Sequence, residues 1–188
     1  MTREEYIRVT AEEYLAAVHT PGDESYRVFV QETLGQWERL KGEGWELVRV
    51  HSSDTYLDSR AMLRDISRRC LRVDTGGQSM AIGHPLAYRV GDWSINEIFR
   101  AVHDVFGHGA HNGGSVCDFE TFEGECQAYL NHRRSYSSWA CPALHGETMG
   151  QLAHYFSGLG FVQVQEAKII PVRNEIIETL NPTSQPGR

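Results

Sequence analysis

The clearest hydrophobic pattern in the chain lies between residues 95 and 106. Apolar residues recur there at spacings of three and four, which is typical of one face of an α-helix: Ile95, Ile98, Phe99, Val102, Val105 and Phe106. Ser94, followed three residues later by Glu97, matches a capping box, in which side chains satisfy the first free backbone groups of a helix. The pattern therefore predicts an amphipathic helix from about residue 95 to residue 106.

Similar periodicities and breaker residues predict the remaining elements. We expect further helices over residues 2–18, 24–41, 59–69, 121–134 and 142–158. Short strands are expected over residues 45–50, 70–73 and 161–165, with a turn at Gly76 and Gly77. The Pro-, Ser- and Gly-rich end, residues 181–188, is expected to be a disordered tail. The fold class we expect is mainly α with a small β component, as a single compact helical domain (residues 1–180) around a metal site.

Composition and charge narrow the classes of function. The 188 residues carry a net charge of −7, which argues against nucleic acid and anionic membranes as partners. No run of about 18 apolar residues exists that would span a membrane. The four cysteines show no C-x-x-C spacing, and no apolar signal segment follows Met1, so we expect a cytoplasmic protein with reduced thiols.

Two histidines stand near the end of the predicted helix. His103 and His108 are five residues apart. On a continuous α-helix, two such residues differ in direction by about 140°, so their side chains could not reach the same metal ion. We therefore expect Gly107 to end the helix in a left-handed conformation and to fold His108 back toward His103. Either histidine alone would be more simply interpreted as a hydrogen-bonded core or loop residue. The pair around a glycine favours a metal site.

Further ligands are available nearby in the sequence. Six of the nine histidines fall in one window: His103, His108, His111, His132, His145 and His154. The helices predicted over residues 121–134 and 142–158 carry Glu125 and Glu147. Two imidazoles and one carboxylate that leave open coordination positions are typical of a non-haem Fe(II) centre that activates oxygen.

The segment His-Asp-Val-Phe-Gly-His, residues 103–108, resembles the iron-binding motif of the pterin-dependent aromatic amino acid hydroxylases. The resemblance extends over about residues 95–160 and implies that His103 and His108 are iron ligands. It implies Glu147, which lies 147 − 108 = 39 residues after His108, as the third ligand. It also implies that Asp104 lies beside a tetrahydropterin and that Arg89 is near the position of an arginine that holds a substrate carboxylate.

We therefore expect a mononuclear non-haem Fe(II) oxygenase that hydroxylates a small, aromatic or amino-acid-like substrate with O₂. Asp104, Glu125 and His132 are expected to act beside the metal, and a tetrahydropterin is the reductant that the resemblance suggests. One alternative is a zinc hydrolase that uses the same cluster with Glu125 or Glu147 as base. Two others are a zinc site built with cysteines (Cys117, Cys126 or Cys141) and a non-enzymatic domain with closed metal coordination.

Overall fold

The computed structural model describes residues 1–51, 55–76 and 79–180. The expected tail, residues 181–188, and Gly77 of the expected turn lie outside the described residues. The α-helices are α1 (Arg3–Ala16), α2 (Glu24–Gly42), α3 (Ser59–Ser67), α4 (Ile95–His103), α5 (Phe122–Arg133), α6 (Cys141–His145), α7 (Gln151–His154) and α8 (Asn174–Leu180). Three π-helical segments extend them: η3 (Asp104–His108), η4 (Gly146–Gly150) and η5 (Tyr155–Leu159). A short 3₁₀ turn, η2, covers Pro85–Ala87.

The helix starts follow from side-chain caps. The capping box predicted at α4 is present, because Ser94 Oγ accepts from the backbone N–H of Glu97 and Glu97 Oε2 accepts from that of Ser94. Asp23 and Asp58 cap α2 and α3 in the same way with a carboxylate oxygen. The apolar face predicted for residues 95–106 is buried along its whole length. The sequence did not lead us to expect a helix over residues 174–180, where the structure has α8.

The β structure consists of three separate strand pairs. β1 (Glu46–Val50) and β2 (Cys70–Asp74) pair in parallel from Glu46 opposite Cys70 to Val50 opposite Asp74. β4 (Arg89–Val90) and β5 (Trp93–Ser94) form a small antiparallel hairpin. β3 (Ser79–Met80) pairs in parallel with β6 (Val164–Gln165), so the strand expected over residues 161–165 is shorter than predicted.

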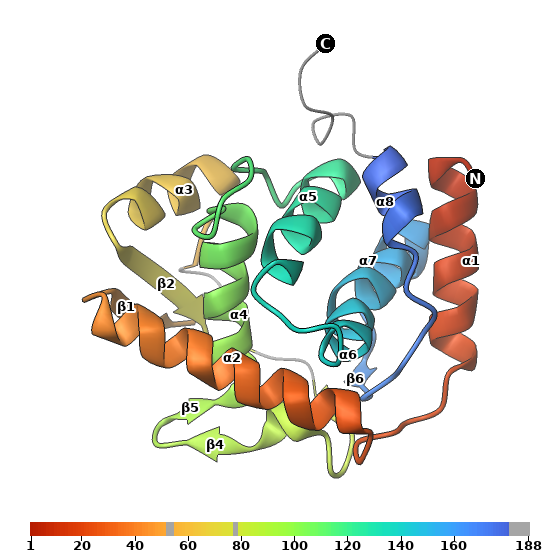
Figure 1. The fold of residues 1–188 in the computed structure, drawn as a ribbon, viewed down its shortest axis with the longest axis horizontal. Helices are drawn as coiled ribbons and strands as arrows, with labels where there is room; N and C mark the ends of the chain where they lie inside the picture. Colours follow the sequence, from red (N-terminus) through yellow and green to blue (C-terminus); the bar gives the residue numbers. More distant parts are fainter. Residues whose placement is uncertain (52–54, 77–78, 181–188) are drawn as a thin grey trace.

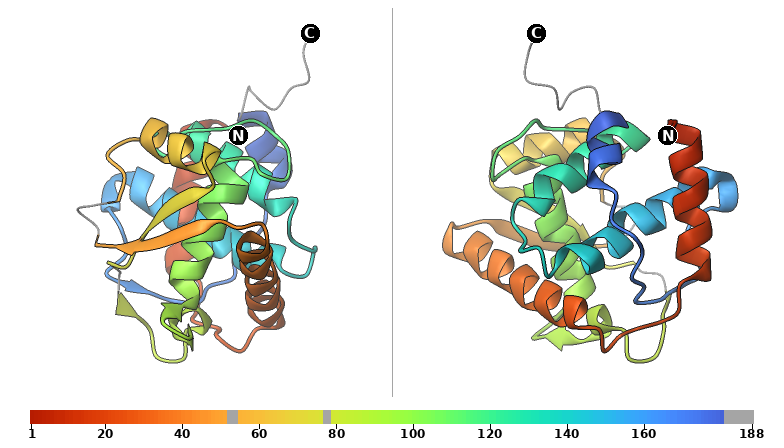
Figure 2. Two further views of the ribbon diagram at one scale, coloured as in Figure 1. Left: turned by 90° about the vertical axis from the view of Figure 1, so that its left-hand side faces the viewer. Right: turned by 45° about the vertical axis from the view of Figure 1, so that its right-hand side comes forward.

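These elements are packed around α4. In Figure 1, α4 lies between the β1–β2 pair with α3 on one side and α5 on the other, while α2 crosses its face. The right-hand view of Figure 2 shows α1 beside α7 and α8, on the side of the molecule away from β1 and β2. A continuous core of buried apolar side chains joins both sides, with aromatic residues such as Phe29, Phe99 and Phe106 near its centre. The structure thus confirms a mainly α-helical, compact single domain with a small β component.

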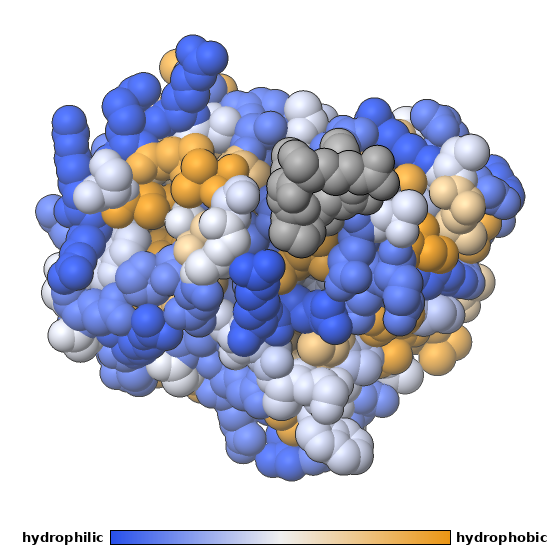
Figure 3. Space-filling model, turned by 45° about the horizontal axis from the view of Figure 1, so that its top comes forward, coloured by the Kyte–Doolittle hydropathy of each residue, from blue (hydrophilic) through white to orange (hydrophobic). Residues whose placement is uncertain are grey.

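The face of the molecule shown in Figure 3 is mostly hydrophilic, with separate hydrophobic patches between the hydrophilic side chains. None of the helices in the described part of the chain has the length and apolar character needed to cross a lipid bilayer. All four cysteines have free thiols.

Candidate metal centre

A π-helical turn brings His103 and His108 together. After His103 the helix widens, and the backbone N–H of Gly109 donates to the carbonyl of Asp104, five residues earlier, at 2.8 Å. This hydrogen-bond spacing places residues five apart on one face of the helix, which an α-helix does not do. The imidazole rings of His103 and His108 lie nearly perpendicular, with ring centres 5.3 Å apart.

The expected role of Gly107 was therefore wrong. Gly107 is not among the glycines with positive φ, and it lies inside η3 instead of ending a helix. It has a different steric role, because a Cβ at this position would lie 3.0 Å from the carbonyl oxygen of Ala128 and 3.2 Å from the His103 ring. The missing side chain lets α5 approach the two histidines closely. The chain reverses only afterwards, where Ala110 adopts a φ of 51°.

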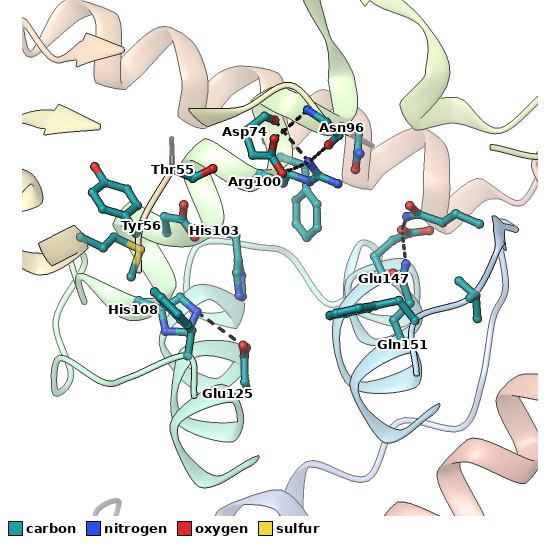
Figure 4. A pocket seen from close by; sticks show the side chains of 18 of the residues that line it. Thr55, Tyr56, Asp74, Asn96, Arg100, His103, His108, Glu125, Glu147 and Gln151 are labelled. Carbon is teal, nitrogen blue, oxygen red and sulfur yellow. Dashed lines mark hydrogen bonds and ion pairs between the residues drawn. The ribbon is translucent and has the colours of Figure 1, made fainter. Parts of the chain in front are cut away.

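The third member of the cluster is Glu125 on α5. Nitrogen atoms of His103 and His108 and a carboxylate oxygen of Glu125 all lie within 4.8 Å of one another. His108 Nε2 is 3.6 Å from Glu125 Oε2, and both side chains are largely buried. Figure 4 shows the three side chains directed toward a common point on one wall of a pocket. In the described part of the chain, these three residues are the one group of His, Cys, Asp or Glu side chains close enough together to hold a metal ion.

Glu147, the third ligand implied by the resemblance, lies elsewhere in the same pocket. It is in η4, across the cavity from the two histidines (Figure 4). Its carboxylate accepts hydrogen bonds from Tyr26 Oη at 2.5 Å, from Gln151 Nε2 at 3.0 Å and from Gln165 Nε2. The structure therefore groups His103 and His108 with Glu125, and it gives Glu147 a separate set of partners.

A chain of hydrogen bonds determines which nitrogen of His103 can bind a metal. Gln36 Oε1 is an acceptor, so His132 Nε2, at 2.8 Å from it, must carry a proton and donate. Burial lowers the pKa of His132 to about 3, so this ring is neutral and its Nδ1 has a lone pair. His103 Nδ1, 3.0 Å from that lone pair, must then donate its own proton. The Nε2 of His103 is left unprotonated, which is the form that ligates a metal.

The His108 ring contacts Cys117 on one side and Glu125 on the other. Its Nδ1 lies 3.7 Å from Cys117 Sγ, while Nε2 faces Glu125. Burial lowers the pKa of His108 to about 4, although backbone hydrogen bonds with Cys117 and Asp118 oppose the shift. Burial and the neighbouring His132 likewise hold the pKa of His103 well below its usual value. Both candidate ligands are thus neutral imidazoles at physiological pH, as metal binding requires.

Burial disfavours the ionised forms of the two carboxyl groups at this wall, Asp104 and Glu125. Burial raises the pKa of Glu125 well above its usual range, and the nearby Asp104 adds to this effect. Burial likewise raises the pKa of Asp104 to about 7. A bound cation would reverse this cost, because it stabilises the ionised carboxylates. Two neutral imidazoles and a buried carboxyl group whose ionised form a cation would stabilise therefore fit a divalent metal ion.

The cluster lies in the wall of a cavity of about 930 Å³. Asp104, the residue that the resemblance places beside a pterin, also lines it. Arg89, the expected substrate arginine, does not, since it belongs to the β4–β5 hairpin and donates to the backbone carbonyl of Asp92. The arginine that lines the cavity is Arg100, whose guanidinium donates to the carbonyls of Asp74 and Gly76 and lies 3.6 Å from the Asp74 carboxylate.

The other sequence candidates are outside the cluster. His132 is in contact with His103 and does not line the cavity. His111 pairs with Glu43 at 2.8 Å, His145 is buried against Tyr129, and His154 bonds to the carbonyl of Gly160. No cysteine is part of the cluster among the residues described.

Several polar residues around the site were missed by sequence reasoning: Tyr26, Gln36, His84, Arg100 and Gln165. Each is far from the histidine motif in the sequence or carries no motif of its own. Arg100 is the one that the sequence could have indicated, because it lies one helical turn before His103 on the same predicted helix.

Comparisons with known proteins assign this chain to no family. No protein-family model, no curated protein and no solved structure matches the chain.

Proposed function

We propose that His103, His108 and Glu125 hold one Fe(II) ion and that the protein is an oxygen-dependent oxidoreductase acting on a small organic substrate. The observation that carries this proposal is the convergence of two neutral, oriented imidazoles and one carboxylate at the wall of a cavity. A metal ion held by these three residues would keep further coordination positions free for O₂, as in non-haem iron oxygenases. The resemblance of residues 103–108 to the hydroxylase motif supports the same choice.

Iron in such a site supplies the activation of dioxygen. Hydroxylation of a C–H bond by O₂ inserts one oxygen atom, and the other leaves as water after taking up two electrons and two protons from a reductant. A tetrahydropterin is the reductant that the sequence resemblance suggests. The cavity of about 930 Å³ is large enough for a substrate together with a co-substrate.

The surrounding residues have separate tasks in this proposal. His132 and Gln36 keep the Nε2 of His103 unprotonated, and Glu125 supplies the anionic ligand. Asp104, with a pKa of about 7, can hold or release a proton at the cavity wall near neutral pH. Phe99 and Phe119 line the cavity near the cluster and reduce the access of water.

Anaerobic reconstitution with Fe(II) and exposure to nitric oxide tests this function. We expect about one iron per chain and the electron paramagnetic resonance signal of an iron nitrosyl, since nitric oxide occupies the position that O₂ would take. The His108→Ala protein is the matched control and should retain no iron. Stoichiometric zinc that iron cannot replace, or bound iron that does not react with nitric oxide, would contradict the proposal.

A zinc hydrolase is the second candidate, favoured by one observation. Asp104 lines the cavity beside the cluster and titrates near neutral pH, so it can serve as the general base for a metal-activated water. Zinc accepts the same nitrogen and oxygen ligands. The metal replacement experiment separates the two candidates, because a hydrolase retains its activity with zinc and needs neither oxygen nor a reductant.

A further inference from the structure

The outer face of α3 carries three exposed arginines. α3 packs against β2, and Met62 and Ile66 on its inner face join the core. Arg60, Arg64 and Arg68 lie four residues apart, so they follow the opposite, solvent side of the helix. We call these three residues the arginine stripe. Figures 1 and 2 show that α3 lies at the outer edge of the molecule, where a partner can reach it.

No group of this chain neutralises the arginine stripe. All three side chains are exposed, and none of them forms a hydrogen bond or an ion pair within the described part of the chain. The neighbouring arginines are different, because Arg72 lies 3.4 Å from the Asp65 carboxylate and Arg69 donates to the carbonyl of Glu43. The guanidinium groups of the stripe are therefore free to bind another molecule.

The position of the stripe is unfavourable within this chain. Like charges four residues apart on a helix repel one another. Arg60 also lies in the first turn of α3, which contains no acidic residue, and the positive end of the helix dipole disfavours a cation there. Asp58, the nearest acid in the sequence, caps the helix through the backbone N–H of Ala61. Local stability therefore does not explain the arginine at position 60.

The remainder of the chain carries the opposite charge. Residues 57–72 contain five arginines and two aspartates, a net charge of +3, so the remaining residues carry −7 − 3 = −10. The stripe is about 12 Å long, and exposed charges interact over about 8 Å at physiological salt. A long nucleic acid or the plane of an anionic membrane would extend beyond the stripe and meet the negative remainder. A short acidic segment of a protein fits within it.

We propose that the arginine stripe is a docking site for an acidic segment of a partner protein, with carboxylates one helical turn apart. A guanidinium group matches a carboxylate through two parallel hydrogen bonds. Carboxylates at every fourth position of a helical segment repeat at about 6 Å, as the three arginines do. The stripe shares no residue with the metal cluster or the cavity lining, so this docking site is independent of the proposed function.

Fluorescence anisotropy with two labelled peptides tests the proposal. The acidic probe is a sixteen-residue peptide with glutamate at every fourth position and alanine or glutamine between, and the neutral probe has glutamine in place of each glutamate. We expect the acidic probe to bind at least about tenfold more tightly in about 50 mM salt, because three weak ion pairs act together. In about 500 mM salt the preference should fall below about threefold, since salt screens exposed charges.

Matched variants locate the site. Replacing the three arginines of the stripe by glutamine should bring the acidic probe to within about threefold of the neutral probe. The control variant combines Arg8→Gln, Arg27→Gln and Arg134→Gln, which removes the same charge from exposed positions on α1, on α2 and at the end of α5. It should keep the preference of the wild type. Arg64→Gln alone should weaken the acidic probe about threefold, and it decides the matter if the triple variant fails to fold by circular dichroism.

Three results with the peptides would overturn the proposal. They are equal binding of the two probes, no binding of the acidic probe at millimolar concentration, and a preference that persists in the variant without the stripe. A twelve-nucleotide oligothymidylate, or vesicles rich in phosphatidylserine, can be added to the same assay. Tighter binding of either one than of the acidic probe, lost in the variant without the stripe, would also overturn the proposal and assign the stripe to nucleic acid or to a membrane.

Discussion

At the scale of single residues, two glutamates on different helices compete for the role of third metal ligand. Glu125 is 3.6 Å from His108 Nε2, whereas the carboxylate of Glu147 is occupied by Tyr26 and two glutamines. We expect Glu125→Gln to weaken Co(II) or Fe(II) binding at least about 100-fold, because it removes the anionic ligand. Glu147→Gln should stay within about threefold of the wild type in the same metal titration. The opposite order would show that Glu147 moves to the metal on binding.

His132 is a positioning residue at the same scale. It accepts the Nδ1 proton of His103 and is itself held by Gln36, so it orients the ligand without touching the metal. We expect His132→Phe to lower metal affinity about 10- to 100-fold, the usual cost of losing such a partner. Phe106→Leu is the control, because Phe106 stacks on the His132 ring and has no polar atom. Loss of affinity in both variants would indicate a packing effect and not a tautomer effect.

At the scale of elements, the π-helical segment η3 depends on close contact with α5. A methyl group at Gly107 would meet the Ala128 carbonyl at 3.0 Å, so the two segments would have to separate. We expect Gly107→Ala to lower the free energy of unfolding by about 1–3 kcal/mol and to weaken metal binding. Gly35→Ala in α2 is the matched control, since nothing lies within 4 Å of its Cβ position, and it should be neutral or slightly stabilising. Urea denaturation of the metal-free proteins measures both.

The same segment shows which features of the site could be predicted from the sequence and which could not. Local signals such as the Ser94–Glu97 capping box and the apolar face of α4 predicted the helix and the convergence of His103 with His108. They did not predict η3, because a π-helical turn is stabilised by packing on α5, and a glycine at position 107 equally suits a helix end. The short strand pairs and the surroundings of Glu147 depend on contacts between residues far apart in the sequence, such as Tyr26 with Glu147, which periodicity does not report.

At the scale of the whole molecule, the cavity is assembled from two halves of the fold. The α4–η3 and α5 segments provide the wall with His103, His108 and Glu125, which we call the metal wall, and the later run of η4, α7 and β6 provides Glu147, Gln151 and Gln165. The core that joins the two halves excludes water, and it contains buried histidines that are neutral, such as His132 and His145. Acid should therefore act on the whole fold and not only on the metal.

His145 gives the clearest test of this acid sensitivity, because it is fully buried and is not part of the metal cluster. Burial lowers its pKa to about 3 in the folded protein, with Arg173 adding to the shift, against about 6.5 in an unfolded chain. The unfolded state thus binds the extra proton first. The stabilising contribution of neutral His145 is complete above pH 6.5 and is lost as the pH falls toward 3, by about 1.4 kcal/mol per pH unit.

Urea unfolding of the metal-free protein at pH 7.5 and pH 5.0 measures this loss. We expect His145→Phe, which retains an aromatic contact with Tyr129, to lose about 2 kcal/mol less than the wild type between these two pH values. His51→Gln, a change at an exposed histidine, should follow the wild type. The His145→Phe protein should also bind the metal as the wild type does, since His145 is outside the cluster. An unchanged pH dependence in His145→Phe would mean that His145 is already protonated or solvated in the folded protein, and that the acid sensitivity comes from the histidines at the metal wall.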